Sequence, residues 1–258
     1  MSALAIIPAR FASTRLPGKP LLSETGKPLI QHVYEQVAAA ACVSRTVVAT
    51  DDDRIRDAVA RFGGEAVMTR TDHLSGTERI AEAARRLDVT EDVILNVQGD
   101  EPEIAPAHLD ALAALQRGSG AFAATLACPF PSDAGSGAGS PLDPSCVKVV
   151  LRNRQSGGAD ALYFSRSLVP SAAREEDVRA QPQNWLLHIG VYAFSPETLQ
   201  RFAAAPASSL ERAERLEQMR ILEMGERIAV ALVDAASPGV DTPADYAAFV
   251  ARQGAARR

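Results

Sequence analysis

Apolar and polar positions follow two periods along the first half of the chain, and these periods predict strands joined by helices. Short apolar runs that suit buried strands alternate with segments in which apolar residues recur every three or four positions. Leu29, Val33 and Val37 lie four residues apart, on one face of a predicted helix. The predicted strands are 3–9, 45–50, 65–69, 92–98 and 121–127, and the predicted helices are 28–40, 52–64, 77–87 and 105–116.

This alternation predicts an α/β fold. Apolar strands that are connected by helices usually form a parallel sheet that is covered on both faces. We therefore expect a mixed, mostly parallel sheet with helices on both faces.

The pattern changes after residue 130. Segment 131–144 is rich in Gly, Ser and Pro and predicts a mobile surface loop. Two strand-like runs, 146–153 and 161–166, flank the sequence RQSGGAD and predict a β-hairpin. Further on we expect a strand at 186–195, a helix at 209–226, a strand at 227–233, and a last helix that Thr242 caps. No internal repeat or clear linker is visible, so we predict a single domain over 1–258 with an added β-hairpin and helical subregion.

Composition narrows the class of protein. The chain of 258 residues has a formal net charge of −5, which argues against nucleic-acid binding and against a polybasic membrane anchor. Its three cysteines, Cys42, Cys128 and Cys146, include no C-x-x-C pair, and we expect them to be reduced thiols. No secretion signal and no apolar run of about 20 residues are visible, so we expect a cytoplasmic protein without membrane insertion.

Three cations occupy the loop after the first strand. Arg10, Arg15 and Lys19 have no acidic residue between them, and the loop also holds the hydroxyls of Ser13 and Thr14. Ligands of open α/β sheets bind beyond the carboxyl ends of the strands. A guanidinium group can donate two parallel hydrogen bonds to two oxygens of one phosphate. The loop therefore predicts a phosphate site. The alternative is a solvated loop whose cations offset acidic residues elsewhere.

One aspartate follows another predicted strand, and a second lies just before the last predicted helix. Asp100 follows the strand 92–98 beside Gly99, and Asp241 directly precedes the cap residue Thr242. Magnesium sites in proteins often use one or two carboxylates, with water and substrate phosphate as the other ligands. The aspartates therefore predict a metal site. The alternatives are a turn residue at 100 and a helix-start acid at 241.

Other polar residues have a structural alternative too. Ser75, Gly76 and Arg79 lie between a predicted strand and a predicted helix, where Ser75 or Thr77 would also serve as the helix cap. His188 lies in a predicted strand, and a histidine there is more often a hydrogen-bonded core residue than a ligand.

Taken together, these motifs resemble the 3-deoxy-manno-octulosonate cytidylyltransferase family. The resemblance runs from about residue 4 to about residue 250, and SGTER, NVQGDEP, YFSR and GVDTP are its most specific parts. The matching segments, in order, are IIPARFASTRLPGKPL, ATDD, MTRTDHLSGTERIAE, ILNVQGDEPEI, VKVVL, ALYFSRSLVP, LLHIGVYAF, LEQMRIL and GVDTPADY. The segment DPSCVKVV departs from the family, which tends to have an Asn-Pro-Asn lead into this strand.

The resemblance implies an activity and a set of site residues. It implies a nucleotide-diphospho-sugar transferase-like fold, a homodimer, and the conversion of CTP and 3-deoxy-D-manno-octulosonate (Kdo) to CMP-Kdo and diphosphate for lipopolysaccharide biosynthesis. Mg²⁺ would be the cofactor, bound by Asp100 and Asp241. The implied catalytic residues are Lys19, Arg15, Asp100 and Asp241. The implied nucleotide-binding residues are Arg10, Arg15, Lys19, Ser75, Gly76, Arg79 and Asp100. The implied sugar-binding residues are Gln98, Arg166, His188, Tyr192 and Glu217.

The same resemblance divides the domain by function. About 1–130 would be the nucleotide-binding half, and about 131–235 would be the sugar-binding and dimerisation subregion. Residues 236–258 would supply the metal-ligand loop and the C-terminal helix.

Three other functions remain open at this point. The nearest is a cytidylyltransferase for another acidic sugar such as a sialic acid. An NAD-dependent oxidoreductase would need a G-x-G-x-x-G after the first strand, which the sequence does not have. The paired strand-end aspartates argue against a non-catalytic nucleotide-binding regulator, and a turnover assay would distinguish it from an enzyme.

Overall fold

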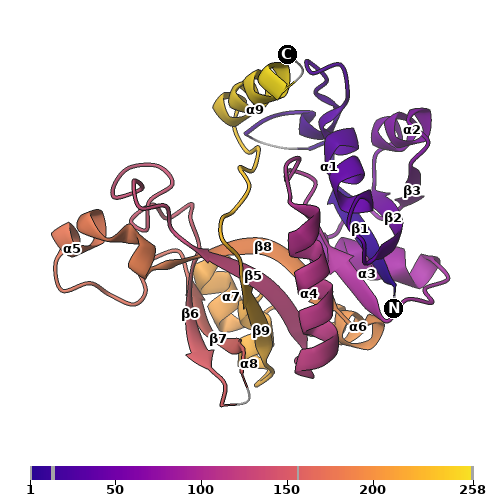
Figure 1. Cartoon of the computed structure of the whole chain (residues 1–258). Coiled ribbons are helices and arrows are strands. Elements are labelled where there is room, and N and C mark those ends of the chain that lie inside the picture. Colours follow the sequence, from indigo (N-terminus) through magenta and orange to yellow (C-terminus); the bar gives the residue numbers. More distant parts are fainter. Residues whose placement is uncertain (1, 13–14, 156, 257–258) are drawn as a thin grey trace. The chain divides into compact units, whose positions relative to one another are not determined.

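A computed structural model describes residues 2–12, 15–155 and 157–256. Ser13 and Thr14, whose hydroxyls contribute to the predicted phosphate site, lie outside this set. The chain divides into two compact units, and the first is discontinuous in sequence (Figure 1). Unit 1 consists of Met1–Asp110 and Ser237–Arg258, and unit 2 consists of Ala111–Ala236. The functional division at about 130 and 236 stays a prediction.

Unit 1 contains four parallel strands in the order β3-β2-β1-β4. Their bounds are β1 Ala3–Ala9, β2 Val43–Thr50, β3 Glu65–Met68 and β4 Val93–Asn96. All residues of β1 except Pro8 are buried, as expected for a central strand that is covered on both faces. The carboxyl ends of β1 and β4 therefore lie side by side, because these two strands pair directly.

The helices of unit 1 agree with the predicted periods. They are α1 Leu29–Ala38, α2 Asp53–Arg61, α3 Gly76–Arg86 and α9 Pro243–Ala256, and a short 3-10 helix η1 spans Lys19–Leu21. The helix α4, Pro106–Ser119, contains the boundary between the units. After α2 the chain turns at Gly63, whose φ of 80° is the left-handed conformation that glycine adopts without strain.

Unit 2 holds five strands in the order β8-β5-β9-β7-β6. Among the described residues of this unit, β5 and β9 pair in parallel, whereas the β5–β8, β7–β9, β6–β7 and β6–β8 pairs are antiparallel. The bounds are β5 Ala123–Pro129, β6 Lys148–Asn153, β7 Ala159–Ser165, β8 Leu186–Phe194 and β9 Ile228–Leu232. The predicted mixed α/β class and the β6–β7 hairpin are confirmed, with parallel pairing concentrated in unit 1.

The prediction of one continuous helix over 209–226 is wrong. The structure has two short helices there, α7 Ser209–Glu214 and α8 Met219–Glu223. A capping box of Ser208 and Glu211 begins α7, and Arg215 ends it with a φ of 55° in the left-handed region. Two further short helices, α5 Glu175–Ala180 and α6 Pro196–Ala204, and the 3-10 helix η2, Pro182–Asn184, were not predicted.

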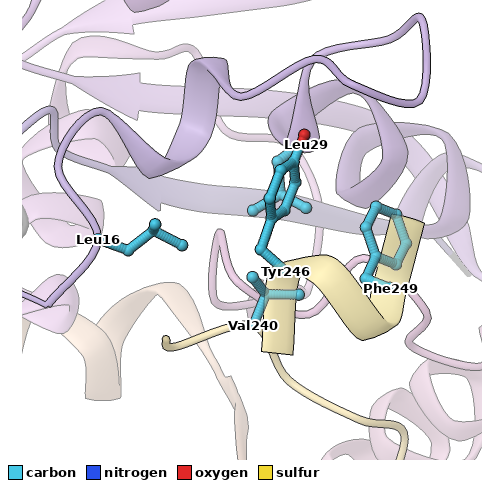
Figure 2. Close-up of a cluster of buried hydrophobic side chains, with 5 residues drawn as sticks. All are labelled: Leu16, Leu29, Val240, Tyr246 and Phe249. Carbon is cyan, nitrogen blue, oxygen red and sulfur yellow. The ribbon is translucent and has the colours of Figure 1, made fainter. Parts of the chain in front are cut away.

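An apolar cluster attaches the returning C-terminal segment to the rest of unit 1. Figure 2 shows its five side chains, which come from the loop after β1, from α1, from the segment before α9 and from α9 itself. They are Leu16, Leu29, Val240, Tyr246 and Phe249, and we call them the C-terminal cluster. Because Val240 belongs to it, this cluster fixes the position of the neighbouring Asp241.

The structure contains no helix suited to crossing a bilayer in the part of the chain that it describes.

Candidate active site

Asp100 and Asp241 meet at one lysine in unit 1. The Lys19 Nζ lies 2.7 Å from Asp100 Oδ2 and 3.1 Å from Asp241 Oδ1, and it donates to the Val240 carbonyl oxygen at 2.9 Å. The Lys19 side chain is 13% exposed. The structure thus brings together the two carboxylates that the sequence places 141 positions apart.

A main-chain hydrogen bond holds these two segments together independently of any side chain. The Val240 amide donates to the Asp100 carbonyl oxygen over 2.9 Å. Past Asp241, Thr242 caps α9 reciprocally with Asp245: the Asp245 amide donates to Thr242 Oγ1, and the Thr242 amide donates to Asp245 Oδ2. With the C-terminal cluster (Figure 2), these contacts leave Asp241 little freedom of position.

Gly99 lets the chain bring Asp100 to this point. A Cβ at residue 99 would lie 3.0 Å from the Pro8 carbonyl oxygen, at the limit of what real Cβ contacts show. The strand β4 can therefore leave the sheet close against the end of β1 only because residue 99 has no side chain.

Glu101 adds a third carboxyl group beside the pair. Burial raises its pKa to about 8, and the nearby charges of Asp100 and Asp241 contribute in the same direction. At neutral pH it is therefore mainly protonated, so the two aspartates supply the negative charge of the site. Sequence reasoning did not give Glu101 a role.

The cations of the loop after β1 lie on the same side. Arg15 Nη2 is 3.2 Å from Asp241 Oδ1, and its side chain is 63% exposed. Arg10 is exposed at the end of β1. Both guanidinium groups are accessible to an anionic ligand.

The N-terminus of α3 forms a further wall. Ser75 caps this helix by accepting a hydrogen bond from the Glu78 amide, so the capping alternative for Ser75 is what the structure shows. Gly76 packs against Pro8, where a Cβ would lie 3.2 Å from the proline ring. The positive end of the helix dipole therefore faces the end of β1, which favours an anion there.

Arg79 has protein partners for its guanidinium group. It is 4% exposed, and it donates to Asp51 Oδ2 at 2.7 Å and to Thr69 Oγ1 at 2.6 Å. These contacts connect α3 to the residues that follow β2 and β3. The contacts that this structure shows for Arg79 hold the pocket wall in place.

His73 and Glu82 form a hydrogen-bonded pair that sequence reasoning missed. The His73 Nε2 contacts Glu82 Oε2, which also accepts from the Arg70 amide. Burial alone would raise the pKa of Glu82, but its hydrogen bonds and the charge of Arg86 hold that pKa below its usual value. A single histidine in a loop carries no sequence signal of such a partner.

Gln98 is oriented by a chain of hydrogen bonds. It donates to Asn96 Oδ1 at 3.2 Å, and Asn96 in turn donates to Thr77 Oγ1 in α3. Asn96 is fully buried, so this chain fixes the amide of Gln98 against the helix start.

One open pocket of about 260 Å³ collects these side chains. Every residue that was predicted for the nucleotide or the metal lines it, as do Gln98 and His73. The lining combines cations, carboxylates and a helix N-terminus, so it suits a phosphorylated ligand together with a cation.

The remaining predicted sugar residues lie in unit 2. Arg166 follows β7, where its Nε donates to the Glu214 carbonyl oxygen and its Nη1 to the Pro144 carbonyl oxygen, each at 3.1 Å. Its backbone carbonyl accepts from the ammonium of the fully buried Lys148. The protein thus fixes both ends of this arginine.

His188 and Tyr192 are neighbours on β8, with ring centroids 5.6 Å apart. The His188 Nε2 lies 2.9 Å from Thr125 Oγ1, and burial lowers the pKa of His188 to about 3, so the imidazole is neutral. Burial, and then the charge of Glu217, raise the pKa of Tyr192 well above its usual value. His188 therefore has the hydrogen-bonded core environment that the structural alternative described.

The donor set at Asp100 and Asp241 fits Mg²⁺. No group of three or more His, Cys, Asp or Glu side chains suited to a metal ion occurs among the residues that the structure describes. Two carboxylates on a pocket for phosphates match the preference of Mg²⁺, which keeps water and substrate oxygens as its other ligands. The Lys19 ammonium already shows that the carboxylate pair accommodates a cation.

Comparisons with known proteins assign almost the whole chain to one family. A model of the cytidylyltransferase family matches residues 4–228. The 3-deoxy-manno-octulosonate cytidylyltransferase of Syntrophobacter fumaroxidans is 48% identical over 97% of this chain and 96% of its own length. That of Escherichia coli is 45% identical over 94% and 92%.

A solved structure, CMP:2-keto-3-deoxy-manno-octonic acid synthetase complexed with CTP, superposes with a TM-score of 0.86. It is 42% identical and the alignment covers 99% of this chain and 100% of that one. Fold, pocket and family model together define a nucleotidyltransferase. Within that class, the chain belongs to the 3-deoxy-manno-octulosonate cytidylyltransferase family.

Proposed function

We propose that this chain transfers a cytidylyl group from CTP to Kdo, forming CMP-Kdo and diphosphate, the activated sugar used in lipopolysaccharide biosynthesis. The observation that carries the proposal is the meeting of Asp100 and Asp241 in a cationic pocket, in a chain that matches the family over nearly its full length. The names of the relatives indicate Kdo as the sugar, and the residues of the pocket suit the binding of a nucleoside triphosphate with a metal ion.

The reaction joins two anions. The anomeric hydroxyl of Kdo attacks the α-phosphorus of CTP, and diphosphate leaves from the opposite side. Repulsion between the Kdo carboxylate and the triphosphate opposes this approach. The protein's contribution is to align the two substrates and to neutralise charge.

The cations of unit 1 neutralise the charge of the triphosphate. Arg10, Arg15 and Lys19 hold the triphosphate, and the N-terminus of α3 adds main-chain donors on the same pocket wall. These groups also stabilise the negative charge that gathers on the departing diphosphate.

Asp100 and Asp241 hold Mg²⁺ in this proposal. When bound there, Mg²⁺ would supply Lewis-acid stabilisation of phosphoryl oxygens and would favour deprotonation of the attacking hydroxyl. The aspartates fix its place at the pocket, and the hydrogen bond from the Val240 amide to the Asp100 carbonyl oxygen keeps them together.

Arg166, His188, Tyr192, Glu217 and Gln98 are the proposed sugar residues. Burial keeps His188 neutral, and its Nε2 already pairs with Thr125 Oγ1, so His188 does not suit a carboxylate and Arg166 is the proposed residue for the Kdo carboxylate.

The direct test is diphosphate release with CTP, Mg²⁺ and a sugar panel that contains Kdo and a sialic acid. We expect release with Kdo only. Release with the sialic acid instead would establish the other acidic-sugar cytidylyltransferase, and no release with any sugar would favour a nucleotide-binding regulator.

We further propose a homodimer located in the cytoplasm. Sedimentation of the purified chain tests the first statement, and fractionation of a producing cell tests the second. A monomer at micromolar concentration would contradict the homodimer.

A further inference from the structure

The ammonium of Lys19 has no proton left for a ligand. Its three donors are used by Asp100 Oδ2 at 2.7 Å, the Val240 carbonyl oxygen at 2.9 Å and Asp241 Oδ1 at 3.1 Å. Yet the same lysine lines the pocket in which a triphosphate would bind. An ammonium in this state neutralises the carboxylates and cannot at the same time neutralise a phosphate.

A divalent ion would compete with Lys19 for the same oxygens. Metal ligation by Asp100 and Asp241 draws on the carboxylate lone pairs that Lys19 occupies, and two cations at one carboxylate pair repel each other. A metal ion therefore binds at the full strength of the pair only when the ammonium has moved away.

We propose that Lys19 is an exchangeable counter-ion, which rests on the aspartate pair in the free enzyme and passes to the triphosphate when nucleotide and metal bind. This rests on the proposed function for the identity of the nucleotide. Because CTP attracts the ammonium and the metal displaces it, each ligand strengthens the binding of the other through one side chain.

The backbone of Lys19 is fixed, so that only the side chain has to move. Gly18 takes a left-handed φ of 67°, the Lys19 amide donates to the Leu16 carbonyl oxygen, and Pro20 follows at the start of η1. Four side-chain bonds of the lysine then remain to carry the ammonium between two anionic partners within the pocket.

The aspartate pair is held together without Lys19. The Val240 amide bonds the Asp100 carbonyl oxygen, and the C-terminal cluster in Figure 2 seats Val240 on Leu16, Leu29 and α9. Removing the ammonium should therefore leave two adjacent carboxylates in place, which form a stronger metal site than before.

A static role for Lys19 predicts the opposite result. If the lysine were only a bridge that keeps the aspartates together in every state, its removal would spread the carboxylates and weaken metal binding. The sign of the change in metal affinity without nucleotide separates the two roles.

The experiment measures Mn²⁺ binding by electron paramagnetic resonance, with the full chain, in the presence and absence of CTP and without Kdo. We expect Lys19→Met to bind Mn²⁺ alone about tenfold more tightly than wild type, and CTP to tighten binding by a smaller factor in the variant than in wild type. Lys27→Met is the matched control, because Lys27 is a surface lysine paired with Glu35, and it should leave both affinities unchanged.

Unchanged or weaker Mn²⁺ binding by folded Lys19→Met would overturn the exchange. Circular dichroism establishes folding, and Lys19→Gln, which keeps a neutral donor, replaces Lys19→Met if that variant does not fold.

Turnover of CTP and Kdo by the same wild-type preparation distinguishes the two proposals. Turnover without the affinity change removes the exchange alone, whereas the affinity change without turnover removes the proposed function alone.

Discussion

Single residues determine the charge of the site and the pH dependence of the protein's stability. Asp100, Asp241 and Lys19 had to be assigned through family motifs, because the physics of each loop alone left a turn or helix-start acid open. The resemblance implied that Asp100 and Asp241 meet, but it did not predict that Lys19 contacts both, since no periodic pattern encodes a side-chain contact between residues far apart in sequence. The His73–Glu82 pair escaped prediction although its members are only nine residues apart, because a single histidine in a loop does not indicate its partner.

Asp100→Asn tests the metal site directly. We expect turnover to fall by about two to three orders of magnitude, because the neutral amide holds a cation far less well. The fold should persist, since Lys19 keeps Asp241 and the Val240 carbonyl oxygen as partners. Steady-state rates and melting curves measure the two effects.

Asp110→Asn is the matched control for this change. The Asp110 carboxylate accepts from the Cys42 amide at 2.7 Å in the same unit, away from the pocket lining. It should lower stability slightly and leave turnover intact. Wild-type turnover by Asp100→Asn with Mg²⁺ present would remove the metal assignment.

His188 should make the protein less stable in acid. Its pKa is about 3 in the folded chain and about 6.5 when unfolded, so between these pH values the unfolded chain binds one more proton. Stability therefore falls as pH drops from about 6.5 toward 3, by up to about 1.4 kcal/mol per pH unit from this group. Urea unfolding at pH 7, 6 and 5 measures the slope, which should be smaller in His188→Gln; equal slopes would contradict the assigned burial effect.

At the scale of elements, apolar periodicity predicted the helices and strands that depend on local sequence pattern. It did not predict structure that depends on which strands pair or on the backbone conformation of one residue. The apolar runs of β1, β2 and β4 identify buried strands, and their parallel pairing follows from the helices between them. Apolar periodicity does not say which strands pair in unit 2. Nor does it predict that Arg215 takes a left-handed conformation and divides the helix expected at 209–226.

Phe249→Leu tests the coupling between α9 and the proposed metal site. The fully buried ring packs in the C-terminal cluster, so the smaller side chain should cost about 1–3 kcal/mol of stability. Because the cluster seats Val240, we also expect weaker Mn²⁺ binding and lower turnover in the folded variant. Denaturant unfolding and Mn²⁺ titration give the two readouts.

Val59→Ala is the comparison for this variant. Val59 is fully buried in α2 of the same unit and makes no part of the pocket. A similar loss of stability without a change in Mn²⁺ affinity is expected. If both variants weakened Mn²⁺ binding equally, the cluster would have no special relation to Asp241.

At the scale of the molecule, the chain builds unit 1 from both of its ends. Unit 2 is inserted between Asp110 and Ser237, and α9 returns to pack with Leu16 and Leu29 (Figure 1). The boundary at Ser237 coincides with a Ser-Pro-Gly sequence and with the division expected at about 236, whereas the boundary at Asp110 lies inside the helical pattern of α4, where no composition change marks it.

Hydrogen exchange in low denaturant should group α9 with unit 1. Units that open cooperatively share one opening free energy, and the contacts of α9 in the C-terminal cluster are with α1 and the loop after β1. We expect peptides from α9 to lose protection together with those from α1, and β9, which directly precedes the returning segment, to follow unit 2. Joint opening of α9 with β9 would contradict this grouping.

The discontinuous unit also imposes an order on biosynthesis. A ribosome adds about 5–20 residues per second, so roughly seven to twenty-eight seconds pass between the synthesis of Asp100 and that of Asp241. During that interval the nascent polypeptide carries Asp100 without Asp241, so the proposed metal site is incomplete. The proposed site is therefore completed only after residue 241 has been synthesised and its neighbour Val240 has packed with Leu16 and Leu29.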